Sequence, residues 1–185
     1  MEVSPTGIPG LVVIKPKVFG DHRGFFLETY SREAYAKAGL DYDFVQDNHA
    51  RSGPKGVLRG LHFQLPPATQ AKLVWVTRGA VYDVVVDLRV GSPTYKKWYG
   101  IELSADNFLR FMVPRGFAHG YVTLTEDAEF MYKVDAPYAP DLDAGIAWDD
   151  PDIGITWPVT DPVLSEKDAV QPRLAAVGSP FVYEP

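Results

Sequence analysis

The chain has 185 residues, of which 46% are hydrophobic and 23% charged, with 16 glycines, 16 prolines and no cysteine. This length suits one domain with a continuous core, and the composition is that of a folded, turn-rich protein, which excludes disordered and fibrous classes. A net charge of −6 argues against a nucleic-acid partner, and the lack of cysteine excludes thiolate catalysis and a disulfide framework.

No stretch approaches the roughly 20 apolar residues needed to span a bilayer. The first ten residues contain Glu2 and Pro5 where a secretory leader has a basic start and an apolar run. We therefore predict no membrane partner and a cytoplasmic location.

Short strand-like runs separated by turn residues dominate the chain. In chain order they cover residues 11–15, 24–30, 57–64, 72–89, 98–103, 109–113, 119–123 and 129–134. Residues 31–38 are the helical stretch, with Ser31 as its N-cap and Gly39 placed to end it. The tail from residue 158 is expected to wrap around the domain irregularly, with residues 178–185 loosely held, and it is able to carry a site residue.

Residues 72–89 give the clearest strand signal, and we predict a hairpin that turns near Gly79. Alternation places Val84 and Val86 on the core face and Asp83 and Asp87 on the other face, where water is expected to solvate them. Many short strands without alternating helices predict an all-β sandwich or jelly-roll barrel with one or two short helices, in a single domain over residues 1–185.

The run V-L-R-G-L-H-F-Q at 57–64 holds Arg59, His62 and Gln64, and Lys72 begins the next strand. In a regular strand Arg59 and His62 face opposite sides, so both reach one pocket only if the strand bends at Gly60, as we predict. Taken singly, such residues are more often a hydrogen-bonded structural histidine and solvated surface charges.

Metal-binding jelly rolls need several histidines or carboxylates on adjoining strands, but Gln64 occupies the second position after His62 and G-F-A-H-G offers only His119. The sequence also has no phosphate-binding glycine loop and no serine in a nucleophile elbow. We predict neither a metal nor an organic cofactor.

Several blocks together resemble the dTDP-4-dehydrorhamnose 3,5-epimerase family, the rhamnose-pathway sugar epimerases of the cupin superfold. The resemblance runs from about residue 11 to residue 173. It is carried by D-H-R-G-F-F-L-E at 21–28, F-V-Q-D-N-H at 44–49, G-V-L-R-G-L-H-F-Q at 56–64, D-L-R-V-G-S-P-T at 87–94, P-R-G-F-A-H-G at 114–120, Y-K at 132–133, G-I-A-W at 145–148, D-P-D-I at 150–153 and L-S-E-K-D at 164–168.

The resemblance implies an isomerase of the cupin-type jelly roll that inverts the carbons beside a ketone. This chemistry needs a base on one face, a cation at the developing enolate oxygen and an acid on the other face. By carry-over, His62 is the base and Asp168 orients it. Lys72 stabilises the enolate, and Tyr132 donates the proton from the opposite side.

The resemblance also implies a set of substrate contacts: Arg23, Glu28, Gln46, Asp47, Asn48, Arg59, His119, Asp143 and Lys167, with Tyr138 stacked on the thymine ring. Asp143 stands where a glutamate is usual and is one methylene shorter, so its contact is lost or needs a bridging water. Other departures from the common pattern are Ala50, Phe63, Ala71 and Trp75. A homodimer is expected, with Arg23 and Glu28 reaching the partner's site.

The activity implied is 3,5-epimerisation of dTDP-4-keto-6-deoxy-D-glucose to dTDP-4-keto-L-rhamnose in dTDP-L-rhamnose biosynthesis. One alternative is an epimerase that inverts only carbon 3 or only carbon 5, although Tyr132 favours double epimerisation. A non-catalytic jelly roll that binds a nucleotide sugar and a metal-dependent cupin are alternatives of other classes. Retention of His62, Lys72, Tyr132 and Asp168 argues against a mere binder, and the missing ligand set argues against a metal enzyme.

Overall fold

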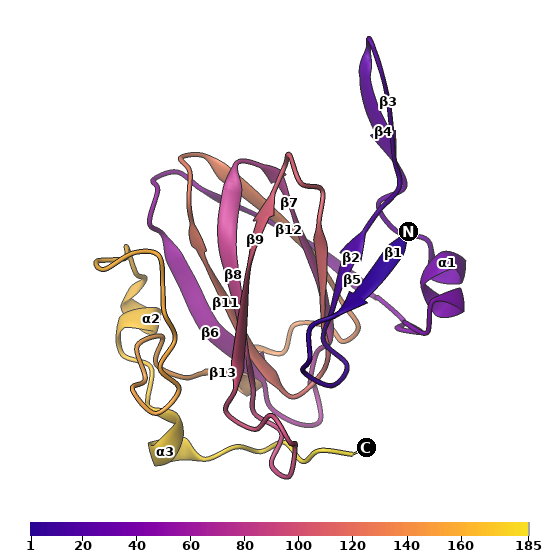
Figure 1. The fold of residues 1–185 in the computed structure, drawn as a ribbon. Helices are drawn as coiled ribbons and strands as arrows, with labels where there is room; N and C mark the ends of the chain where they lie inside the picture. Colours follow the sequence, from indigo (N-terminus) through magenta and orange to yellow (C-terminus); the bar gives the residue numbers. More distant parts are fainter. Residues whose placement is uncertain (185) are drawn as a thin grey trace.

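The computed structural model describes residues 1–184, which form two antiparallel sheets that face each other (Figure 1). The first sheet has the order β1-β2-β10-β7-β12-β5. Its strands are Glu2–Pro5 (β1), Val12–Lys15 (β2), Arg110–Val113 (β10), Lys72–Arg78 (β7), Ala128–Val134 (β12) and Gln46–Ser52 (β5). The second sheet has the order β13-β6-β11-β8-β9. Its strands are Asp143–Gly145 (β13), Leu58–Gln64 (β6), Phe117–Thr123 (β11), Ala80–Asp87 (β8) and Trp98–Ser104 (β9). The predicted all-β jelly roll is confirmed.

The hairpin predicted for residues 72–89 is wrong, although both of its strands form. β7 pairs with β10 and β12 in the first sheet, whereas β8 pairs with β9 and β11 in the second. Gly79, with φ of +70°, carries the chain from one sheet to the other. A Cβ atom there would lie 2.2 Å from Thr125 Oγ1 and 3.3 Å from the Cα of Ala128. Apolar alternation looks the same in a hairpin and at such a corner, so the pattern did not distinguish them.

The expectation that Asp83 and Asp87 are solvated is also wrong, because both residues are 0% exposed. β8 is an inner strand of its sheet and is covered on both faces. Val85 belongs to the cluster between the sheets, while Val86 and Leu88 belong to a cluster that includes tail residues. The face that carries the carboxylates is therefore interior, and each carboxylate needs polar partners there.

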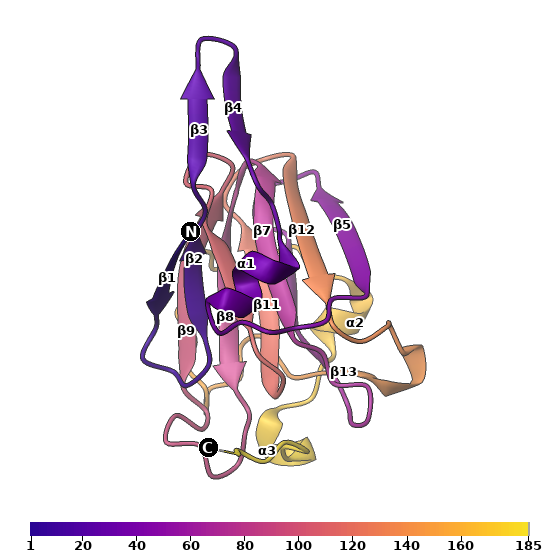
Figure 2. The same cartoon turned by 90° about the vertical axis from the view of Figure 1, so that its right-hand side faces the viewer.

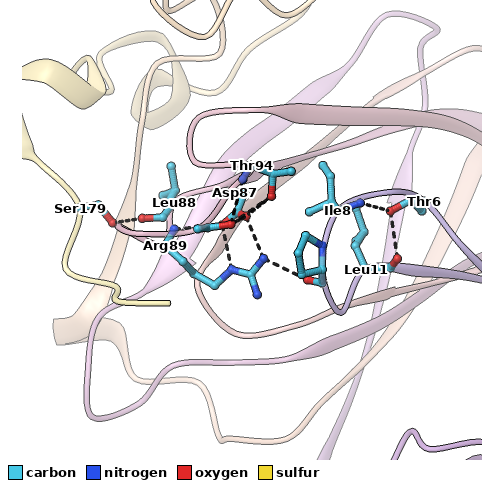
Figure 3. A network of polar contacts seen from close by, with 10 residues as sticks. Thr6, Ile8, Leu11, Asp87, Leu88, Arg89, Thr94 and Ser179 are labelled. Atoms are coloured by element: carbon cyan, nitrogen blue, oxygen red, sulfur yellow. Dashed lines mark hydrogen bonds and ion pairs between the residues drawn. The ribbon is translucent and has the colours of Figure 1, made fainter. Parts of the chain in front are cut away.

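Asp87 finds its partners in the loop that follows β8 (Figure 3). Its carboxylate accepts hydrogen bonds from Arg89 Nε and Nη2, each at 2.8 Å, from Ser92 Oγ at 2.6 Å and from Thr94 Oγ1 at 2.7 Å. Arg89 also donates to the carbonyl oxygen of Pro9 at 3.0 Å. This network joins the first loop of the chain to the β8–β9 connection.

We expect Asp87→Asn to lower the free energy of unfolding at neutral pH by about 3 kcal/mol, because it leaves the buried guanidinium of Arg89 without its countercharge. Burial acts to raise the pKa of Asp87, but its hydrogen bonds outweigh burial and the pKa is lowered. The stabilisation is therefore present above about pH 4 and is lost as the pH falls further, whereas the variant lacks this dependence. Denaturant unfolding between pH 3 and 7 measures both effects.

Glu33→Gln, which removes an exposed ion pair with Lys37, should leave the unfolding midpoint unchanged. Equal midpoints for Asp87→Asn and wild type would contradict the prediction.

A two-stranded hairpin, Val18–Asp21 (β3) and Gly24–Leu27 (β4), projects away from both sheets (Figures 1 and 2). Phe19, Phe25 and Phe26 are 52%, 63% and 70% exposed on it. Such exposure of three aromatic side chains on one projection is unusual for an isolated protein surface.

The helix α1 (Arg32–Lys37) lies against the outer face of the six-stranded sheet (Figure 2). The Ser31 side chain caps it by accepting a hydrogen bond from Ala34 N at 3.3 Å, and Gly39 follows it with φ of +80°. The predicted start and end are therefore confirmed. Tyr35 is the buried residue of the helix, and it packs in a cluster with Leu73 and Trp75 of β7.

The tail is more regular than predicted. Within residues 1–184 it adds the short helices Glu166–Ala169 (α2) and Leu174–Val177 (α3), after a 3-10 turn at Pro140–Leu142 (η1). Residues 178–184 are not loosely held: Phe181 is 7% exposed and packs edge-on against Phe63, with 5.5 Å between ring centroids. Residue 185, also in that prediction, lies outside the described residues. None of the helices formed by residues 1–184 has the length and hydrophobicity that crossing a bilayer requires.

Candidate active site

One cavity of about 410 Å³ opens between the two sheets and the tail. Seven residues singled out from the sequence line it, and they come from four strands and from α2. These are Arg59 and His62 of β6, Lys72 of β7, His119 of β11, Tyr132 of β12, and Lys167 and Asp168 of α2.

The bend predicted at Gly60 explains how Arg59 and His62 share this cavity. The pairing of β6 with β11 runs from His119 opposite His62 to Tyr121 opposite Arg59, so its register shifts between the two pairs. Gly60 has φ of +141°, and a Cβ atom there would lie 2.6 Å from the Cα of Gly120. A side chain is excluded by both conformation and space, so glycine makes the shift possible.

The tail contributes the partner of His62. Asp168 Oδ1 lies 2.5 Å from His62 Nε2, and Asp168 is 4% exposed. Ser165 caps α2 by accepting a hydrogen bond from Asp168 N at 3.1 Å, which fixes the aspartate on the first turn. Burial acts to raise the pKa of Asp168, but the hydrogen bond and charge of His62 and the contact with Ser165 lower it overall. Asp168 is thus an ionised acceptor that orients the imidazole.

Lys72 starts β7 in the opposite sheet and lines the same cavity. Among residues 1–184 its ammonium has no ion-pair partner within 4.0 Å, although lysines of protein interiors are normally paired. Burial lowers the pKa of Lys72 to about 8, with the charges of Asp143 and Asp83 acting in the opposite direction. The ammonium form therefore prevails at neutral pH and is available to an oxygen in the cavity.

Tyr132 faces the cavity from the six-stranded sheet, whereas His62 faces it from the five-stranded sheet. Its strand places it opposite Val74 of β7 and Asn48 of β5. Burial raises the pKa of Tyr132, so the phenol keeps its proton at neutral pH. A histidine and a protonated tyrosine on opposite walls can serve the two faces of one bound carbon.

A chain of polar contacts links β5 with α2 beside this cavity. Gln46 donates to Asn48 Oδ1 at 2.9 Å and accepts from Tyr138 N at 3.1 Å. Tyr138 OH donates to Asp143 Oδ2 at 3.2 Å, and Lys167 donates to the same oxygen. The structure thus brings these five predicted residues together, and Tyr138 keeps 57% of its surface exposed. Asp47, on the same strand, pairs with Lys133 at 2.7 Å.

Two predicted residues lie neither at the cavity of their own chain nor in the polar chain beside it. Arg23 lies in the β3–β4 hairpin, where its guanidinium pairs with Asp21 at 2.6 Å and its side chain is 78% exposed. Glu28 directly follows β4 and is exposed. Neither residue lines the cavity.

The sequence reasoning missed Asp83, whose carboxylate contacts His119 beneath the cavity wall. It also missed Tyr121, which lines the cavity and whose buried hydroxyl has no hydrogen-bond partner among residues 1–184. The sequence does carry a signal for Asp83. It is an acidic residue inside an apolar strand, and such a residue needs a polar partner if both faces of the strand are covered. In the part of the chain that the structure describes, no three side chains of the metal-ligating kinds cluster as a metal site would require.

The fold is a cupin-like jelly roll, and its cavity brings together a histidine, a lysine and a tyrosine that suit acid–base chemistry. The profile of the dTDP-4-dehydrorhamnose 3,5-epimerase family matches residues 5–176, and this chain belongs to that family. The sequence is 52% identical to the dTDP-4-dehydrorhamnose 3,5-epimerase of Sinorhizobium fredii over 172 residues, which cover 92% of this chain and 88% of the relative.

Solved structures agree with this assignment. The Bacillus anthracis dTDP-4-dehydrorhamnose 3,5-epimerase with bound TDP and pyrophosphate superposes with a TM-score of 0.92 at 48% identity, covering 94% of this chain and 99% of that one. The Legionella pneumophila dTDP-6-deoxy-D-glucose-3,5-epimerase in complex with dTDP-4-keto-L-rhamnose gives a TM-score of 0.93 at 44% identity, covering 99% of each chain. The family resemblance seen in the sequence is confirmed.

Proposed function

We propose that this chain converts dTDP-4-keto-6-deoxy-D-glucose to dTDP-4-keto-L-rhamnose, as a step of dTDP-L-rhamnose biosynthesis. The observation that carries the proposal is the placement of the His62–Asp168 pair on one wall of a cavity that Tyr132 and Lys72 line from the opposite sheet. Membership of the family supports the same substrate.

In the proposed mechanism, neutral His62 takes the proton from a carbon beside the C4 ketone, and the electron pair moves to the ketone oxygen as an enolate. The Lys72 ammonium stabilises that oxygen. Tyr132 then gives a proton to the carbon from the opposite face, which inverts the centre and regenerates the ketone. The same groups serve carbons 3 and 5, since both adjoin the same ketone.

The nucleotide end of the substrate is proposed to bind along the polar chain between β5 and α2. Arg59 and Lys167, at the cavity wall, suit the diphosphate. The exposed ring of Tyr138 offers a face for the thymine, and Gln46, Asp47 and Asn48 offer groups that hydrogen-bond to its edge. Asp143 is proposed to act by holding Lys167 and Tyr138, with His119 contacting the sugar from within the cavity.

The decisive experiment follows the substrate by proton NMR in deuterated water with purified, chelator-treated protein. We expect the signals at carbons 3 and 5 both to disappear, and an L-sugar to be trapped when a reductase is added. Exchange at one carbon only would identify a single-carbon epimerase. Binding without exchange would contradict catalysis on this substrate, and activity that chelation abolishes would indicate a metal enzyme.

The Tyr132→Phe variant separates proton removal from inversion. We expect deuterium exchange to continue, because His62 can return a deuteron to the face from which it took the proton. Formation of the L-sugar should fall by about 100-fold, since the acid on the other face is lost. Loss of exchange and product by the same factor would contradict the assignment of Tyr132 to the opposite face.

We further propose that the enzyme is a cytoplasmic homodimer in which the β3–β4 hairpin of one protomer completes the cavity of the other. The exposed Phe19, Phe25 and Phe26 support this, because a partner surface would cover them. The hairpin would carry Arg23 and Glu28 to the partner's diphosphate and nucleoside.

Mixed dimers test this exchange of hairpins. His62→Ala and Arg23→Ala chains are each expected to be weakly active alone. After co-refolding, heterodimers have one cavity with both defects and one with neither, so about a quarter of the wild-type activity should return. Mixing His62→Ala with Asp168→Asn, two changes in the same cavity, is the matched control and should restore nothing. Failure of the first mixture to regain activity would contradict the shared site.

A further inference from the structure

Asp83 is a buried carboxylate that the proposed mechanism does not use. It lies on the inner strand β8 and is 0% exposed. Taking an ionisable group out of water is costly unless its hydrogen bonds are satisfied, so its presence inside the sheet sandwich calls for a reason beyond packing.

The carboxylate of Asp83 holds one edge of His119. Its Oδ1 and Oδ2 atoms lie 3.0 and 2.9 Å from His119 Nε2. Because a carboxylate only accepts, Nε2 carries a proton. The other ring nitrogen, Nδ1, has no hydrogen-bond partner among residues 1–184, although His119 lines the cavity. The ring also stacks on Phe130 with 6.1 Å between centroids, so its plane is held as well.

The charge of Asp83 also acts on Lys72, although no ion pair within 4.0 Å joins them. Burial raises the pKa of Asp83, while the charges of His119 and Lys72 lower it. In return, Asp143 and then Asp83 oppose the effect of burial on the Lys72 ammonium. The other charged or titratable groups around this cavity are His62 and Arg59 of β6, Tyr121 of β11, Tyr132 of β12, and Lys167 and Asp168 of α2. Asp83 therefore contacts His119 directly and favours the charged form of Lys72 from beyond ion-pair distance.

We propose that Asp83 is a positioning residue of the epimerisation, which fixes the tautomer and the orientation of His119 so that the unprotonated Nδ1 accepts a hydrogen bond from a hydroxyl of the bound sugar. This inference rests on the proposed function. His119 supplies this contact from β11, and the negative charge of Asp83 also favours the ammonium form of Lys72 on β7. Asp83 itself does not touch the substrate.

The test is Asp83→Asn, which keeps the size and an acceptor oxygen but removes the charge. We expect kcat for exchange at carbons 3 and 5 to fall by about 10- to 100-fold, as for other residues that orient a reacting group, with KM changing much less. The basic limb of the kcat profile should move to lower pH, because Lys72 loses one of the two charges that favour its ammonium form. In a His119→Gln background the same change should reduce kcat further by less than about 3-fold.

Asp87→Asn is the matched control, since Asp87 is equally buried on the same strand but, among residues 1–184, its carboxylate bonds only residues that do not line the cavity. It should lower stability and leave the pH profile in place. An Asp83→Asn enzyme with the wild-type kcat and profile would overturn the inference while leaving the function intact, whereas no exchange by the wild type would overturn both. NMR of ¹⁵N-histidine in the wild type needs no variant: a proton on Nδ1 alone of His119 would also overturn the inference.

Discussion

Replacing His62 by alanine is expected to reduce deuterium exchange at carbons 3 and 5 by about 1,000-fold, with substrate binding changed much less. The proposed base is then missing, and water in the cavity is a far weaker and less well placed acceptor. The measurement is the initial rate of signal loss by proton NMR under saturating substrate. Binding of dTDP to the variant, followed by calorimetry, shows that the site is still formed.

Asp168→Asn probes the same base through its partner. The amide keeps the size of the carboxylate but is neutral and can present a donor to His62 Nε2, which favours the wrong tautomer and removes the charge that stabilises the imidazolium. We expect exchange to fall by at least about 100-fold.

His49→Ala is the control for both variants. His49 also pairs with a carboxylate, Glu129 at 3.3 Å, but it is 52% exposed and does not line the cavity. This variant should exchange protons at the wild-type rate. Retention of activity by His62→Ala, or an equal loss in His49→Ala, would remove His62 from the role of base.

The fold class could be predicted from the sequence because strands that pack against a core contain recognisable runs of apolar residues. β5 shows where this signal ends. Its residues, Q-D-N-H-A-R-S, have no apolar face, and it is an edge strand that forms through pairing with β12, with Asn48 opposite Tyr132. Long-range pairing of this kind decides the structure of a polar strand, and no local pattern records it.

The features of the site likewise fall into those that the sequence could predict and those that it could not. The bend at Gly60 could be predicted, since only a break in the alternation lets Arg59 and His62 reach one pocket. The contact of His62 with Asp168 joins residues 106 positions apart, so it was accessible only through the family resemblance. Asp83 was misjudged because alternation reports two faces of a strand but does not say whether the second face is covered. The face of β8 that carries Asp83 and Val85 packs against the other sheet, while the tail covers the face of Val86 and Leu88, so both faces are buried.

Lys72→Met is expected to lower kcat for exchange by about 100- to 1,000-fold, because a developing negative charge on the ketone oxygen loses the cation that stabilises it. Exchange measured over a pH range also tests the charge state. Burial lowers the pKa of Lys72 to about 8, so the wild-type rate should decline as the pH rises through that value and the ammonium is lost.

The conservative variant Lys72→Arg separates charge from shape. Arginine keeps its proton throughout the range, so any remaining activity should lack the decline near pH 8. Lys97→Met, which removes an exposed lysine of the β8–β9 loop, should keep both the wild-type rate and the decline. A decline near pH 8 that persists in Lys72→Met would assign it to another group, and the enolate would then need a different partner. If the decline disappears in both Lys72 variants, the cavity uses its lysine as a cation whose buried surroundings set the upper limit of the working pH.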